Sequence, residues 1–165
     1  MHHRAGPVIS LLALLLGHAA ACAQNIKIEL EVRLPKAKKT VHQETLPSGF
    51  IASPRAVMQT SGSDPVDIRW KVTSSAPKDI MKNLILHLVA VKEDQAGQRA
   101  VPRLDRDVAA ETACTLDMKP GDSATGELRV RIPRPGAYLI RLETIGAATG
   151  LEGHEYFAAL DLVVK

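Results

Sequence analysis

The sequence predicts a single antiparallel β-sandwich of the all-β class, preceded by a cleaved signal peptide. Apolar and polar residues alternate with a period of two in one segment after another, which is typical of strands with one buried face. Pro and Gly separate these segments at short intervals. The chain has 165 residues, 45% of them hydrophobic and 24% charged, which is ordinary for one globular domain.

The N-terminus has the three-part layout of a secretory signal peptide. Arg4 gives a basic start, residues 8–16 form an apolar run, and small residues lead to Ala21-Cys22-Ala23. The apolar run is shorter than the roughly 20 residues that a membrane-spanning helix needs. We therefore expect export of the protein rather than a membrane anchor at this segment.

We expect cleavage after Ala23, so that residues 1–23 are the signal peptide and residues 24–165 the β-sandwich domain. The mature protein would be periplasmic or secreted. The alternative is a bacterial lipoprotein, because Ala20-Ala21-Cys22 resembles a lipobox. In that case Cys22 would be lipidated and the membrane would be a partner.

About eight strands are expected after the signal peptide. The first is the clearest, because Ile26, Ile28 and the apolar residues at every second position up to Leu34 alternate with charged residues. The best helical candidate is one short turn at Asp105–Glu111. The expected strands cover residues 26–34, 55–61, 66–73, 83–91, 112–118, 126–132, 137–145 and 155–164.

Residues 115–144 resemble the late strands of immunoglobulin-like and fibronectin-III-like modules. The Pro135-Gly136 turn precedes Tyr138, and in such modules a tyrosine at the start of a strand hydrogen-bonds at the sheet corner. Trp70, on an early strand, resembles the core tryptophan of these folds. The resemblance is to a superfold and not to a family, and a superfold does not specify a function.

Composition and motifs disfavour several functional classes. Loss of residues 1–23 removes one base and no acid, and the small remaining positive charge is not that of a nucleic-acid-binding protein. The chain has no P-loop and no GxSxG, GxGxxG or CxxC motif, so we expect neither catalysis nor a cofactor. Aromatic residues make up only 3% of the chain. Trp70 and Tyr156 fall at strand positions whose side chains we expect to point inward, which disfavours the alternative of a carbohydrate-binding module.

A second alternative is a metal-binding or electron-transfer accessory protein. Glu152, His154 and Glu155 lie together in a glycine-rich segment, and these side chains ligate divalent cations. His87 and Cys114 would be further ligands. A solvated hairpin is the simpler interpretation of the segment, and we expect Cys114 to be a small buried hydrophobic residue.

Loop placement gives the leading hypothesis. If successive strands alternate in direction, their connections alternate between the two ends of the sandwich. The connection at residues 92–111 is long, and long connections are often functional. One end would then hold residues 62–65, 92–111 and 133–136, and the other end residues 35–54, 74–82 and 146–153.

The first of these ends carries four arginines that we consider candidate contacts. We predict an exported, non-catalytic binding or accessory module of the bacterial periplasm or envelope. It would contact another protein through these loops or through an edge strand. The candidate residues are Arg99, Arg103, Arg106 and Arg134.

Overall fold

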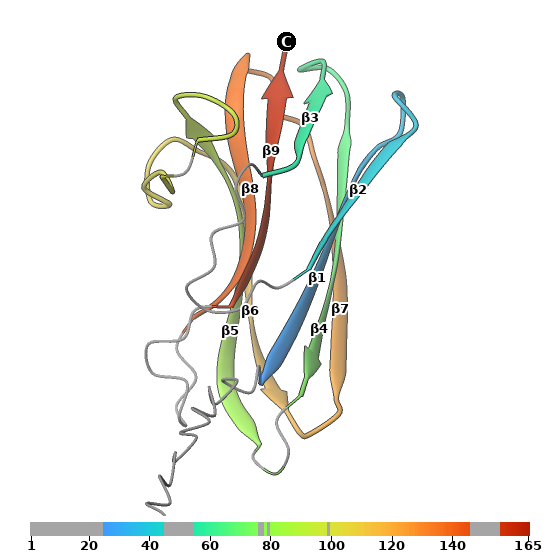
Figure 1. Ribbon diagram of the computed structural model, residues 1–165, viewed down its shortest axis with the longest axis vertical. Coiled ribbons are helices and arrows are strands. Elements are labelled where there is room, and N and C mark those ends of the chain that lie inside the picture. Colours follow the sequence, from blue (N-terminus) through green and yellow to red (C-terminus); the bar gives the residue numbers. More distant parts are fainter. Residues whose placement is uncertain (1–24, 45–54, 76–77, 79, 99, 146–155) are drawn as a thin grey trace, which may run out of the picture.

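The computed structural model describes residues 25–44, 55–75, 78, 80–98, 100–145 and 156–165. Two packed β-sheets form a sandwich in this part of the chain, which confirms the predicted fold class (Figure 1). The strands are β1 (Ile26–Leu34), β2 (Lys39–Glu44), β3 (Val57–Thr60), β4 (Val66–Ser74), β5 (Met81–Glu93), β6 (Val108–Met118), β7 (Ser123–Val130), β8 (Gly136–Ile145) and β9 (Phe157–Val164).

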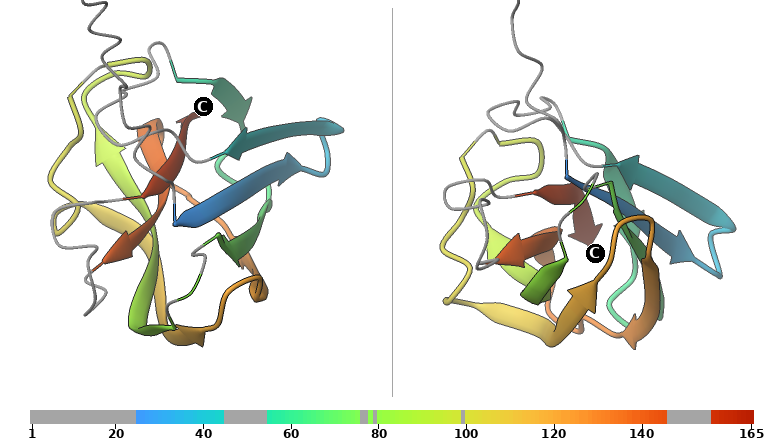
Figure 2. Two further views of the ribbon diagram at one scale, coloured as in Figure 1. Left: turned by 60° about the horizontal axis from the view of Figure 1, so that its bottom comes forward. Right: turned by 90° about the horizontal axis from the view of Figure 1, so that it is seen from below.

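The four-stranded sheet has the order β2-β1-β4-β7, and the five-stranded sheet has the order β3-β9-β8-β5-β6. Neighbouring strands are antiparallel, except for the parallel pair of β3 and β9. Figure 2 shows the two layers from further directions. The edge strands are therefore β2 and β7 in one sheet and β3 and β6 in the other.

The core lies between the sheets, because each strand turns one parity inward. On β1 the alternation seen in the sequence is also the burial pattern, with apolar residues buried at every second position. Tyr138 and Tyr156 are buried as predicted, at 2% and 5% exposure. The centre of the core also contains Ile28, Leu30, Ile68, Leu86, Ile140, Leu142, Leu160 and Leu162.

The structure corrects the expected placement of residues 35–38. Residues 39–44 form β2, which pairs with β1 from Glu29↔Glu44 to Leu34↔Lys39. The extra strand reverses the chain, so the turn at residues 35–38 lies at the same end as residues 61–65, and Lys36 forms an ion pair with Asp64. The sequence does not indicate β2, because it is an edge strand with mostly exposed side chains and so has no apolar period.

The helical turn expected at Asp105–Glu111 is wrong. Val108 begins β6 and pairs with Val91, so pairing with β5 overrides the helical preference of the alanines that follow. Because β5 extends to Glu93, the connection between β5 and β6 is limited to residues 94–107.

This connection covers part of the outer face of the five-stranded sheet. Leu104 packs against a second apolar cluster formed by Val89, Val91, Leu139 and Ala159. The long connection therefore contributes to packing. Its charged side chains belong to a segment that Leu104 anchors to the sheet.

A buried charged cluster fastens the same region. The Arg55 guanidinium contacts the carboxylates of Glu93, at 2.7 Å, and Asp161. All three side chains are at most 6% exposed, and the Gly97 N–H donates to Asp161. Burial, followed by the neighbouring Asp161 carboxylate, raises the pKa of Glu93 to about 7. The cluster joins β5, β9, the segment that precedes β3 and the 94–107 connection.

Candidate functional site

The predicted arginines lie at one end of the sandwich, as far as the structure describes them. Arg103, Arg106 and Arg134 are exposed there, and Arg99 lies outside the described residues. Arg103 is already engaged, because its guanidinium donates to Asp105 at 3.0 and 2.6 Å. Arg134 lines a pocket.

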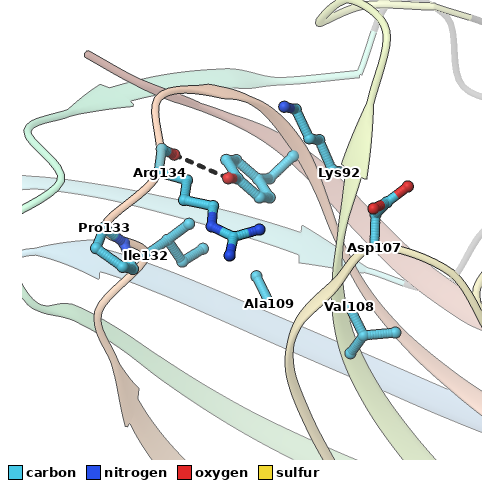
Figure 3. A pocket seen from close by; sticks show the side chains of 8 residues that line it. Lys92, Asp107, Val108, Ala109, Ile132, Pro133 and Arg134 are labelled. Atoms are coloured by element: carbon cyan, nitrogen blue, oxygen red, sulfur yellow. Dashed lines mark hydrogen bonds between the residues drawn. The ribbon is translucent and has the colours of Figure 1, made fainter.

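That pocket has a volume of about 320 Å³ and lies between the start of β6 and the segment that precedes β8 (Figure 3). The Tyr138 hydroxyl donates to the Arg134 carbonyl at 2.8 Å, which is the corner hydrogen bond expected from the sequence. Burial raises the pKa of Tyr138 and keeps this hydroxyl a donor. The lining residues are Lys92, Asp107, Val108, Ala109, Ile132, Pro133, Arg134 and Tyr138.

The pocket carries more positive than negative charge. Within the described residues, neither Lys92 nor Arg134 has an ion-pair partner, and one carboxylate, Asp107, lies on the lining. In Figure 3 the Arg134 side chain extends toward the start of β6. The pocket can therefore accept an acidic group that approaches along β6.

Strand β6 presents an unusually open edge, which we call the β6 edge (residues 108–118). It is 11 residues long, and eight of its side chains between Val108 and Asp117 are exposed. Natural edge strands are usually short or carry charges, proline or bulges that prevent further pairing. Strand β6 has one bulge, at Ala109, near its start. The central residues 110–116 lie beyond this bulge and contain one charged side chain, Glu111, and no proline. The β6 edge is therefore available for a further strand.

The other edge strands are less suited to pairing. Strand β3 has only four residues, and β2 carries Lys39 and Glu44 at its ends. Strand β7 contains Gly126 in its centre, followed by Glu127 and Arg129. These features shorten, charge or weaken the edges, as edge protection requires.

A slot of about 130 Å³ opens between β6 and β7. The Trp70 indole lies against Gly126 on the neighbouring strand, where an added Cβ would come within 2.2 Å of the indole Cζ2 atom. Only glycine at this position lets the ring lie across β7. The slot is lined by Trp70, Leu86, Leu88, Thr112, Ala113, Cys114, Gly126, Glu127 and Leu142.

The slot corrects the prediction for Cys114, which is exposed and free rather than buried. The Cys114 side chain does lie on the inward face of β6, beside Leu86. The strand that follows β6 in sequence, β7, belongs to the opposite sheet, so none of the described strands pairs with the free edge of β6. Trp70 is only half-buried and also lines the slot.

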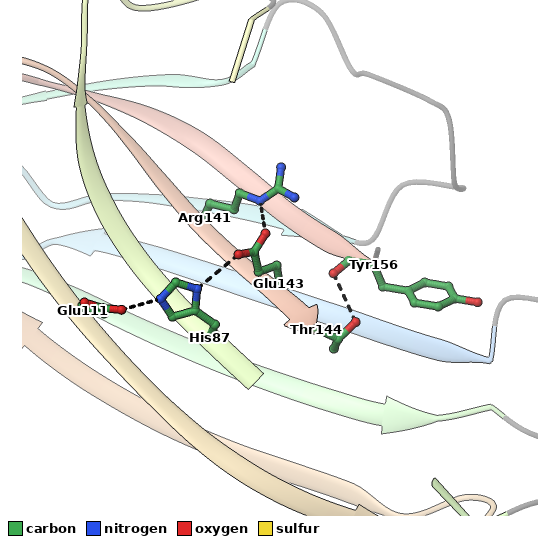
Figure 4. Close-up of polar contacts among 6 residues, drawn as sticks. All are labelled: His87, Glu111, Arg141, Glu143, Thr144 and Tyr156. Atoms are coloured by element: carbon green, nitrogen blue, oxygen red, sulfur yellow. Dashed lines mark hydrogen bonds and ion pairs between the residues drawn. The ribbon is translucent and has the colours of Figure 1, made fainter. Parts of the chain in front are cut away.

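A chain of charged side chains reaches the β6 edge on the outer face of the same sheet (Figure 4). The two ring nitrogens of His87 lie 2.9 Å from Glu111 and 3.1 Å from Glu143. Arg141 donates to Glu143 at 2.6 Å and stacks over the Phe157 ring at 4.1 Å. The chain holds the Glu111 carboxylate in place.

The predicted metal ligands are not brought together in the described part of the chain. His87 lies on the outer face with Glu111, whereas Cys114 lines the inward slot. The described residues contain no group of three His, Cys, Asp or Glu side chains arranged to hold a metal. Glu152, His154 and Glu155 lie outside the described residues.

Sequence reasoning missed the β6 edge, Lys92 and Asp107. The one signal available was the low charge of residues 110–116. Its meaning depends on β6 being an edge strand, which is a property of sheet order and not of the segment itself.

Comparisons with known proteins give fold-level likeness only. No protein-family model and no curated protein matches the chain. The C-terminal domain of wzt is similar with a TM-score of 0.46 and 11% identity, over 86% of this chain and 74% of that one. The PmoD soluble domain from Methylocystis sp. ATCC 49242 (Rockwell) has a TM-score of 0.42 and 14% identity, over 84% and 90%. Both TM-scores are too low to transfer a function.

Among the described residues, no helix is long and apolar enough to cross a bilayer.

Proposed function

We propose that this protein is a non-catalytic binding or accessory module that contacts a protein partner by strand addition at β6. The observation that supports the proposal is the β6 edge, an 11-residue exposed strand beside an open slot. In strand addition, main-chain hydrogen bonds supply affinity and pockets for alternate side chains supply specificity. Here the β6 backbone supplies the main-chain hydrogen bonds, and the slot supplies the side-chain specificity.

The predicted loop surface has a place in the same proposal. Val108 and Ala109, the first residues of β6, line the pocket that contains Arg134. A strand added along β6 therefore reaches this pocket at one end, where Arg134 and Lys92 meet an acidic group of the partner. Loop and edge form one continuous contact surface.

The proposal places the protein in the bacterial periplasm or envelope, after export through residues 1–23. The sequence of the leader supports this location. Mass spectrometry of the protein from its native envelope fraction tests it, with a chain that begins at Gln24 as the expected result. A diacylated Cys22 at the N-terminus would instead identify an anchored lipoprotein.

The proposal also assigns the sandwich to the immunoglobulin-like or fibronectin-III-like kind. The corner hydrogen bond of Tyr138 and the inward parity of Trp70 support this assignment. Sandwiches of this kind carry binding loops at their ends in antibody domains, which agrees with a non-catalytic binding role.

Site-specific photocrosslinking in the native host tests strand addition. A photoreactive side chain is placed at Thr115 on the β6 edge, and the matched control is placed at Gln43 on the edge strand β2. We expect a discrete adduct from position 115 and none from position 43. Equal labelling from both positions, or no adduct from position 115, would refute strand addition at β6.

A further inference from the structure

We infer that the strand added at β6 is β6 of a second copy of this chain, paired antiparallel about a twofold axis at Ala113. The inference rests on the proposed strand addition and names its partner. A twofold axis at Ala113 places each residue from Ala110 to Leu116 opposite the residue equally far on the other side of position 113. Ala109 is a bulge in β6, so Val108 and Ala109 together lie opposite Asp117 of the second copy. The pairing joins the two five-stranded sheets into one continuous sheet.

The pocket that contains Arg134 gains an acidic group in the same register. Val108 and Ala109, both on the pocket lining, lie opposite Asp117 of the second copy. One oxygen of Asp117 accepts the Asn83 N–H at 2.8 Å, and the other carboxylate oxygen remains for Arg134 and Lys92. The two cations that lack partners in one copy thus face a carboxylate from the other.

The middle of the strand fits as well. Glu111, held at one oxygen by His87, lies opposite the exposed hydroxyl of Thr115 in the second copy, which can donate to its other oxygen. Thr112 lies opposite Cys114 on the inward face, so small uncharged side chains meet over the slot. Ala113 meets its own counterpart on the axis.

The register with its axis at Cys114 is disfavoured by like charges, because it would place Glu111 opposite Asp117 of the second copy. Like charges directly opposite destabilise an antiparallel pair. A register shifted by a single residue would place the inward-facing side chains of one copy opposite the solvent-facing side chains of the other.

Disulfide trapping tests the register. In a full-length chain with Cys22→Ser and Cys114→Ser, the change Ala113→Cys places two thiols opposite each other, within the range of a disulfide. The matched control Thr115→Cys leaves the two thiols about 13 Å apart along the strands. Under mild oxidation we expect a reducible dimer from the first variant and little from the second. No dimer from Ala113→Cys, or equal trapping by both variants, would overturn the inference.

Light scattering and sedimentation of the otherwise unmodified protein give a second readout. We expect a dimer whose dissociation constant rises about tenfold in Arg134→Glu and stays unchanged in the control Arg131→Glu. A monomer at all concentrations would overturn the inference. The photocrosslinked adduct at position 115 then separates the two proposals, because an adduct with another protein keeps strand addition and excludes self-pairing.

Discussion

The buried cluster of Arg55, Glu93 and Asp161 predicts an unusual pH dependence of stability. Two carboxylates share one guanidinium in a site closed to solvent, and the pKa of Glu93 is raised from 4.5 to about 7. In the unfolded chain Glu93 ionises near its ordinary pKa. Between these values the folded state holds a proton that the unfolded state has lost, so the free energy of unfolding falls as pH rises.

The size of the effect follows from the two pKa values. Each pKa unit corresponds to about 1.4 kcal/mol, so the raised pKa of Glu93 corresponds to roughly 3 kcal/mol. This stability is fully present below about pH 4.5 and is lost by about pH 7. Glu93→Gln keeps the shape of the side chain and cannot ionise, so the variant should retain the stability at high pH.

Urea unfolding at pH 4.5 and pH 8 measures the effect, with Glu127→Gln as an exposed control. We expect Glu93→Gln and the wild type to be similar at pH 4.5, and the variant to be more stable at pH 8 by up to about 3 kcal/mol. The control should follow the wild type at both pH values. A difference between Glu93→Gln and the wild type that does not change with pH would refute the reasoning.

Two further substitutions test local packing. Gly126→Ala places a methyl group on the Trp70 indole, and we expect a loss of about 1–3 kcal/mol with a red shift in the emission of this single tryptophan; an unchanged spectrum would contradict the contact. Tyr138→Phe removes the hydrogen bond to the Arg134 carbonyl, and urea unfolding should show a loss of about 1 kcal/mol. Stability equal to that of the wild type would mean that this corner hydrogen bond does not contribute.

The predictable part of the fold comes from strands that are buried on one face. Along β1 the alternation in sequence is also the burial pattern. Strand β2 was missed because its side chains are mostly exposed, so no apolar period marks it. Strand β6 was predicted too short, because residues 108–111 owe their extended form to pairing with β5 rather than to their own preference.

The candidate site was less accessible to sequence reasoning. Arg134 was identified from the alternation of strand directions, but Lys92 and Asp107 meet it only through the packing of three segments. The exposure of Cys114 shows what the alternation of apolar and polar residues cannot predict. Parity gives the face on which a side chain lies, whereas its burial depends on whether a neighbouring strand covers that face.

The position of β9 has a consequence for the order of folding events. This strand lies between β3 and β8, so the five-stranded sheet cannot be completed before residues 157–164 have emerged. Its Asp161 also supplies the contact to Arg55, which lies more than 100 residues earlier in the chain. Until then β3 has no sheet neighbour among the described strands, and closing so long a loop is slow. The sheet of the nascent chain therefore stays open, and accessible to chaperones, until β9 is free to pair.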